Sequence, residues 1–193
     1  MSNTELLTLL AKHSSWASSN GFSGRKVSFH AQDFTGMTFE DQNFSYADFT
    51  GSILKNVTFK NCKLHRCNFN DCVFENTKFL DCGLADTGFN TDITSCSFFG
   101  TDIQDSDRLM ETIQKYQYDV KLQIGKLYQL SKLIKWDIRR HLKPVELPDE
   151  DIYYAVYLGD SSDNKISFLV QDVVVRDFPW WAKLWAFQEI DSQ

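Results

Sequence analysis

The chain has 193 residues and a formal net charge of −6. This acidic balance argues against direct binding to nucleic acid, which requires a basic surface. The sequence has neither a basic and apolar leader nor an apolar run long enough to cross a bilayer, so we expect a cytoplasmic protein without a membrane span.

Residues 1–24 are expected to form a helical cap. Leu6, Leu10 and Trp16 follow a helical spacing among polar residues. His13 could act as a ligand or a base, but no partner His, Cys or Ser motif lies nearby, so we interpret it as part of the cap. The cap would cover the strand edges and aromatic rings at the start of the region that follows.

The region from about Val27 to Ile103 repeats a large apolar residue at every fifth position, with one step of four after Phe89. A second series, two positions earlier, is mostly small. A period of five fits neither a helix nor an ordinary strand and therefore marks an internal repeat. The large residues are Phe29, Phe34, Phe39, Phe44, Phe49, Leu54, Phe59, Leu64, Phe69, Phe74, Phe79, Leu84, Phe89, Ile93, Phe98 and Ile103.

The pentads 32–36, 47–51 and 67–71 show the motif best: a residue that is often small, then Asp or Asn, then Phe, then two further residues. This motif resembles the pentapeptide-repeat family. The resemblance implies a mainly β fold over residues 25–106, a right-handed quadrilateral parallel β-helix of about four coils. In such a coil, residues twenty apart stack, which predicts one ladder of rings from Phe29 to Phe89 and another from Phe39 to Phe98. The family resemblance also implies a bacterial origin.

All five cysteines occupy the small position of a pentad. Cys62, Cys67 and Cys72, with His65, look like zinc ligands, but successive corners of the coil lie too far apart for one zinc ion with bonds of ~2.3 Å. We therefore expect no metal and no other cofactor. Cys62 and Cys82 should stack about 4.8 Å apart, which a disulfide tolerates, although a cytosolic chain would keep them reduced.

Acidic residues are prominent at the outward positions of the repeat. Their ordinary roles are solvation and turn formation. The resemblance adds a second interpretation, imitation of DNA phosphates, as in family members that bind type II topoisomerases. Four coils would span roughly 15–19 Å, or about five base pairs, and an end-to-end homodimer would double that length. Lysines between 55 and 78 interrupt the surface. The candidate acidic-face residues are Asp33, Asp41, Asp48, Asp71, Asp81 and Asp86.

Residues 107–193 are expected to form an α+β region. Helical spacing begins at Leu109, becomes ambiguous with strand alternation over 116–124, and predicts a firm helix over 127–142. Pro144 and Pro148 mark a linker. Residues 152–158 and 165–175 then predict a β-hairpin.

The end of the chain is rich in aromatic residues and is expected to form a helix that begins at Pro179. These rings either pack in the core against the hairpin or dock to a partner protein, since Trp is enriched in binding hot spots. Binding to a membrane surface is a third interpretation, weakened because Lys183 alone would attract anionic lipid. The candidate partner-binding residues are Trp180, Trp181, Trp185 and Phe187.

No sequence motif for catalysis is found: the phosphate-binding loop, the nucleophile elbow and the HExxH zinc motif are all missing. We therefore predict a non-enzymatic protein–protein interaction module, in which a rigid repeat scaffold presents the C-terminal region to a protein partner. A DNA mimic that binds a topoisomerase or another DNA-handling enzyme is the first alternative. An unrecognised enzyme or toxin activity in residues 107–193 is the second.

Overall fold

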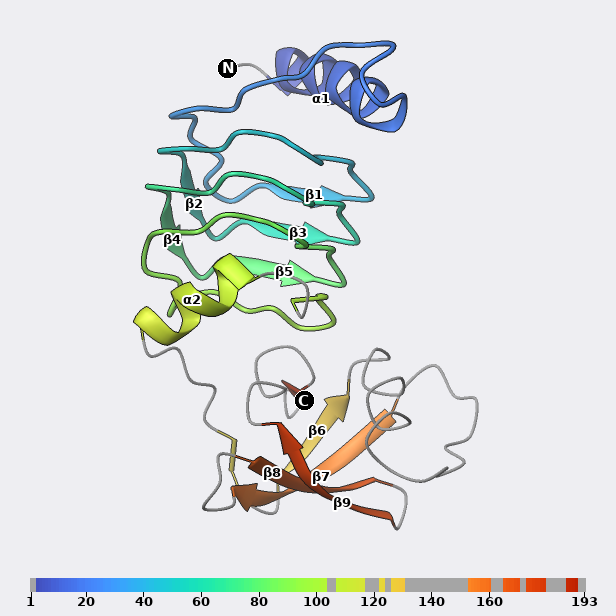
Figure 1. Ribbon diagram of the computed structural model, residues 1–193, viewed down its shortest axis with the longest axis vertical. Helices are drawn as coiled ribbons and strands as arrows, with labels where there is room; N and C mark the ends of the chain where they lie inside the picture. The colour runs from blue at the N-terminus through green and yellow to red at the C-terminus, as the bar shows by residue number, and fades with distance from the viewer. Residues whose placement is uncertain are drawn as a thin grey trace. The chain divides into compact units, whose positions relative to one another are not determined.

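The structure is a computed structural model that describes residues 3–103, 107–116, 122–123, 126–130, 153–160, 165–170, 173–179 and 187–190 (Figure 1). The chain divides into two compact units, Met1–Tyr118 and Asp119–Gln193. The sequence suggested a boundary after residue 106. The observed division falls later because the helix that follows the last coil belongs to the first unit.

Helix α1 spans Asn3–Ser18, which confirms the helix expected at the start of the chain. Leu6, Leu10 and His13 lie on one face of this helix and are buried. The turn after the helix depends on Gly24, whose φ is +77°. A Cβ atom at this position would lie 2.3 Å from the carbonyl oxygen of Lys12, so only glycine lets the chain fold back this closely over α1.

The repeat region winds into parallel coils, which confirms the parallel β-helical arrangement (Figure 1). Strands β1 (Thr38–Glu40), β3 (Thr58–Lys60) and β5 (Lys78–Leu80) form one parallel sheet, and β2 (Ile53–Lys55) pairs with β4 (Val73–Glu75). Isolated bridges continue the same register elsewhere on the coil. Side chains in neighbouring coils that bond to each other, such as those of Glu40 and Lys60, are 20 residues apart.

Two ladders of stacked phenylalanine rings fill the core, as predicted. The ring centroids from Phe29 to Phe89 are 5.1, 4.8 and 5.2 Å apart, and those from Phe39 to Phe98 are 5.3, 5.2 and 5.2 Å apart. Rings of one ladder meet rings of the other edge to face, which is a favourable aromatic geometry. After Phe89 the coil continues with a spacing of 19 residues, as the single step of four requires.

Many small positions of the pentads hold a hydroxyl or thiol group that bonds to the preceding coil. Ser52 Oγ donates to the carbonyl oxygen of Phe29 at 2.7 Å, and Thr101 Oγ1 donates to that of Phe79 at 2.9 Å. Each such bond satisfies a buried carbonyl group that the strand ladder leaves free. A hydroxyl or thiol is therefore the natural choice at these positions.

Helix α2 (Asp107–Lys115) follows the last coil of the first unit. Its apolar residues Leu109 and Ile113 are fully buried. Thr112 Oγ1 donates to the carbonyl oxygen of Phe89 at 2.5 Å, which is the bond that a small residue of a further coil would make. Helix α2 therefore ends the repeat region as a further coil would: its apolar residues are buried, and Thr112 bonds to the carbonyl group of Phe89.

The second unit contains a five-stranded sheet in the order β10-β6-β7-β8-β9, with antiparallel pairing throughout. The strands are β6 (Leu127–Leu130), β7 (Tyr153–Asp160), β8 (Lys165–Val170), β9 (Val173–Pro179) and β10 (Phe187–Glu189). The predicted hairpin is confirmed as β7 and β8. The strand expected over 165–175 is in fact two strands, because the chain reverses between Val170 and Val173.

Two helix predictions in this unit are wrong where they can be compared. Leu127–Leu130 forms a strand rather than the start of a helix, because Tyr128 and Leu130 also satisfy the alternation of a strand and β7 supplies a partner. Phe187–Glu189 is a strand that pairs with β6. Residues 131–142 and 180–186 lie outside the described residues. No helix in the described part of the chain is long and apolar enough to cross a membrane.

Candidate functional site

The six candidate acidic-face residues take part in local turns and contacts between coils. Asp33 Oδ1 accepts a hydrogen bond from the Thr35 N–H at 2.9 Å, and hydrogen bonds from Thr35 lower the pKa of this carboxyl group. Asp48 Oδ1 accepts one from the Thr50 N–H at 3.1 Å. These two residues therefore fold the turn that follows them.

The other four acidic residues lie at corners of the coil, in the left-handed backbone region that Asp and Asn tolerate. Their φ angles are 57°, 58°, 52° and 57° for Asp41, Asp71, Asp81 and Asp86, respectively. Asp86 forms an ion pair with Arg66 at 3.2 Å. Corners of this kind need small polar residues for backbone reasons, whatever the protein binds.

The register of the coil separates these acidic residues. Asp41 and Asp81 lie in one column, with Asn61 between them, because their numbers differ by a multiple of the coil length. The remaining four lie in other columns. The structure therefore does not bring the six residues together as one acidic face, and their arrangement does not favour DNA mimicry.

The five cysteines are free and buried. Cys67 Sγ and Cys72 Sγ donate to backbone carbonyl groups of the preceding coil, each at 3.0 Å. Burial raises the pKa of Cys72 to about 12, so its thiol stays protonated at neutral pH. Cys62 Sγ donates to the carbonyl oxygen of Phe39 and Cys82 Sγ to that of Phe59, both at 3.4 Å, so the two thiols hold equivalent positions in successive coils, in agreement with their predicted stacking. Among the described residues, no three side chains of metal-binding type are grouped.

His13 joins helix α1 to the first coils. Its Nδ1 accepts a hydrogen bond from the Val27 N–H, and its Nε2 donates to the carbonyl oxygen of Ser45, both at 3.1 Å. This pattern requires the neutral ring with its proton on Nε2. Burial lowers the pKa of His13, which favours the same neutral form. The interpretation of His13 as a cap residue is therefore confirmed.

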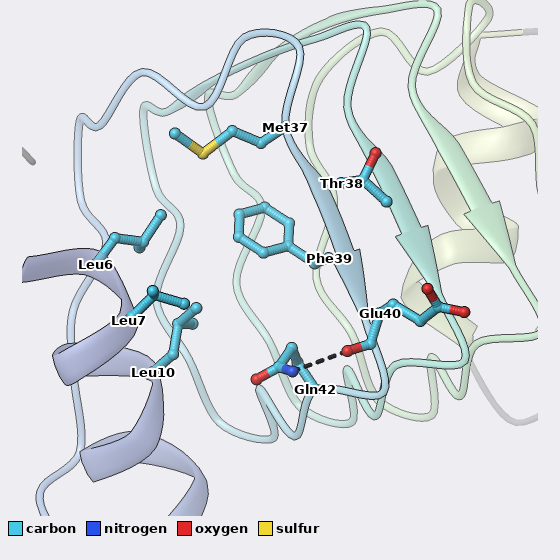
Figure 2. A pocket seen from close by; sticks show the side chains of 8 residues that line it. All are labelled: Leu6, Leu7, Leu10, Met37, Thr38, Phe39, Glu40 and Gln42. Atoms are coloured by element: carbon cyan, nitrogen blue, oxygen red, sulfur yellow. Dashed lines mark hydrogen bonds between the residues drawn. The ribbon is translucent and has the colours of Figure 1, made fainter. Parts of the chain in front are cut away.

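A groove of about 420 Å³ lies between helix α1 and strand β1 (Figure 2). Leu6, Leu7 and Leu10 line it on the helix side, and the segment 37–40 with Gln42 lines it on the coil side. Leu7 is 66% exposed. The sequence analysis missed this groove, although the signal was present: α1 carries leucines beyond the single face that a cap needs to bury.

One face of the second unit's sheet forms its core, and Phe187 belongs to that face. The Phe187 ring is only 6% exposed. It packs edge to face against Tyr128 at 6.2 Å and Phe168 at 5.3 Å. For Phe187 the core interpretation is therefore correct and the docking interpretation is wrong. Trp180, Trp181 and Trp185 lie outside the described residues.

The opposite face of this sheet carries a row of apolar residues that the sequence analysis did not identify. Cross-strand pairing places Leu127 beside Val156, Val156 beside Leu169, and Leu169 beside Val174. Leu127 and Val174, at the two ends of the row, are 48% and 42% exposed. We call Leu127, Val156, Leu169 and Val174 the apolar row. The sequence analysis missed the apolar row because it predicted a helix over residues 127–130, and Leu127 lies beside Val156 only when this segment is a strand.

Comparison with known proteins bears on the repeat region. The sequence model of pentapeptide repeats matches residues 25–61 and 52–87, with eight copies of the repeat. Among solved structures, a pentapeptide-repeat protein from the thylakoid lumen of Arabidopsis thaliana is similar, with 13% sequence identity, coverage of 64% of this chain and 86% of the other, and a TM-score of 0.15. No curated protein matches the sequence. The matched residues coincide with the parallel coils described above, so residues 25–87 of the chain consist of pentapeptide repeats.

Proposed function

We propose that this protein is a non-enzymatic protein–protein interaction module. A rigid right-handed quadrilateral β-helix of about four coils would act as the scaffold, and the C-terminal unit would carry the surface that binds a protein partner. Pentapeptide-repeat proteins are commonly interaction modules, which is consistent with this assignment.

The apolar row is the observation that carries the proposal. Leaving apolar surface in water costs about 25 cal/mol per Å². A row that crosses four neighbouring strands is a continuous patch, and continuous exposed apolar patches mark interaction sites in soluble proteins. Tyr154, which is also exposed and lies on β7, can extend the patch. Tyr residues are enriched at interfaces.

The packing of the repeat region supports a scaffold role. Phe59 and Phe69 are fully buried, and each is in contact with rings above, below and beside it. The buried thiols and His13 already make hydrogen bonds to the backbone. Stacked rings and satisfied polar groups make a stiff support for the surface carried elsewhere in the chain.

A capture experiment with charged variants tests the proposal. The full-length protein, Val174→Lys and Val73→Lys would be used in parallel to capture partners from host lysate. Val73 is the matched control, since it is a valine of similar exposure, 47% against 42%, but lies on the coil. We expect Val174→Lys to lose the captured partner and Val73→Lys to keep it, with circular dichroism unchanged in both.

Two results would overturn the proposal. One is a partner that both Val174→Lys and Leu127→Lys still capture, because these two variants place a charge at each end of the apolar row. The other is capture that duplex DNA competes away and that fades at high salt, because this pattern belongs to a DNA mimic.

A further inference from the structure

We propose that the groove between helix α1 and strand β1 binds an extended segment of a partner protein, which adds to β1 as a further parallel strand. The segment would carry a large apolar residue followed by Lys or Arg. This site lies in the first unit and does not depend on the proposed role of the apolar row in the second.

Within the part of the chain that the structure describes, β1 is an edge strand, and the backbone groups on its outer side pair with no other strand. The sheet order β1-β3-β5 leaves β1 with one neighbour. Met37 and Asp41 bond to the second coil, through Thr58 N–H to Met37 O at 2.9 Å and Asp41 N–H to Lys60 O at 3.0 Å. Because bonding direction alternates along a strand, the N–H and C=O groups of Thr38 and the N–H of Glu40 point to the opposite side. An unpaired edge of this kind is a template for an added strand.

The two walls of the groove favour a single extended chain as its occupant. Helix α1 forms the facing wall, with Leu6, Leu7 and Leu10 turned toward Phe39 (Figure 2). The volume of about 420 Å³ is in the range of pockets that hold small ligands or a few side chains. Because α1 faces the edge of β1 across the groove, we infer that an extended segment rather than a folded domain pairs with this edge.

The coil itself indicates which side chains suit this position. On the paired side of β1, Phe59 stacks on Phe39 at 5.3 Å and Lys60 bonds to Glu40 at 2.6 Å. A segment on the free side meets the same two residues of β1. Its apolar side chain would enter the groove beside Phe39, and its basic residue would approach Glu40 and Asp41, where two carboxylates face one lysine. This charge balance favours Lys or Arg over Asp or Glu.

The edge is already partly protected at one point. Gln42 Nε2 donates to the carbonyl oxygen of Glu40 at 2.8 Å, so this acceptor is occupied (Figure 2). The added strand would therefore be held through Thr38 and the Glu40 N–H. Thr38 is consequently the residue to change.

A peptide titration followed by NMR tests the proposal. The probe is the acetylated and amidated peptide Asn-Val-Thr-Phe-Lys-Asn, which copies residues 56–61, added to the isotope-labelled full chain. We expect saturable shifts of the Thr38 and Glu40 amides and of the Leu7 methyl groups. The same peptide with Glu in place of Lys should bind more weakly.

Proline substitutions separate edge pairing from unspecific binding. Thr38→Pro removes the outward donor but keeps the bonds of β1 to β3, and proline is tolerated on the free side of edge strands. We expect it to weaken peptide binding about tenfold, the effect of one lost hydrogen bond plus ring clash. Asp33→Pro is the control, since Asp33 holds the same pentad position in the first coil but lies away from the groove. Because this change also removes the carboxylate that bonds to the Thr35 N–H, its backbone spectrum must show a folded chain.

Three outcomes would overturn the proposal. The first is the lack of saturable shifts with the peptide at millimolar concentration. The second is equal peptide affinity for the wild-type protein and Thr38→Pro, with the backbone spectrum of the variant showing a folded chain. The third is a shift of the same amides when the protein alone is concentrated, because a second copy would then occupy the groove.

Discussion

Replacement of Phe59 by alanine should destabilise the coil more than any change at its surface. The Phe59 ring is fully buried, stacks between Phe39 and Phe79 at 5.3 and 5.2 Å, and meets Phe44, Phe49 and Phe69 edge to face. Truncation of a buried phenylalanine typically costs about 3–5 kcal/mol. We expect the upper part of this range, since aromatic pairs add about 0.5–1.5 kcal/mol each.

Phe59→Leu separates the contribution of the buried side-chain volume from that of the aromatic pairs. Leucine already occupies equivalent central positions at 54 and 64, so the site should accept it without a large cavity. We expect a loss of about 1–2 kcal/mol, mainly from the aromatic pairs.

The assay is urea unfolding followed by far-ultraviolet circular dichroism at fixed protein concentration. Phe22→Ala is the control, because Phe22 is 94% exposed and its truncation should leave the midpoint unchanged. If Phe59→Ala cost less than about 1 kcal/mol, the ring ladders could not be the main source of stability in the repeat region. Equal losses for Phe59→Ala and Phe59→Leu would show that cavity formation contributes little.

Three further predictions concern the two ends of the coil. Because burial lowers the pKa of His13 below 6.5, the unfolded chain binds a proton first as the pH falls. The free energy of unfolding should therefore be constant above pH 6.5 and decline below it. Urea unfolding between pH 8 and pH 5 checks this. A His13→Gln variant whose stability declines as steeply as that of the wild type would contradict it. Thr112→Val should lower the free energy of unfolding by about 1–3 kcal/mol, because it leaves the Phe89 carbonyl group without its hydrogen bond. Thr112→Ser keeps the hydroxyl group and should retain most of the wild-type stability in thermal or urea unfolding. Equal losses for the two variants would show that packing rather than the hydrogen bond is responsible. Gly24→Ala should destabilise the protein more than Gly36→Ala in the same assay. Both residues have positive φ, but of the two only Gly24 would bring an added Cβ against the backbone of α1. The reverse order would refute the close packing of Gly24 on Lys12.

The repeat region could be predicted from sequence because its burial is set locally. Most central residues of the pentads are buried by the next turn of the same pattern, so the five-residue period alone predicts the ladders from Phe29 and Phe39. The single step of four after Phe89 shortens one coil to 19 residues, and Phe98 still stacks on Phe79. The separation of the six acidic residues could also be predicted from the sequence, because residues in one column must differ in number by a multiple of the coil length.

The second unit could not be predicted in the same way because its elements depend on distant partners. Residues 127–130 satisfy both helical and strand spacing, and pairing with β7, almost thirty residues later, decides between them. The sequence before Phe187 predicts a helix, yet Phe187 pairs with β6 from much earlier in the chain. The groove beside β1 likewise depends on where α1 lies across the coil, which no local pattern specifies.

The bond from Thr112 to Phe89 has a consequence for how this fold can change in length. Helix α2 meets one particular column of the coil and offers its hydroxyl group to one particular carbonyl. Duplication of a single pentad would turn every later residue by one side and present α2 to the wrong column. Duplication of a whole coil would restore every contact at both ends. Gene duplications that survive in such a protein should therefore come in units of one complete coil.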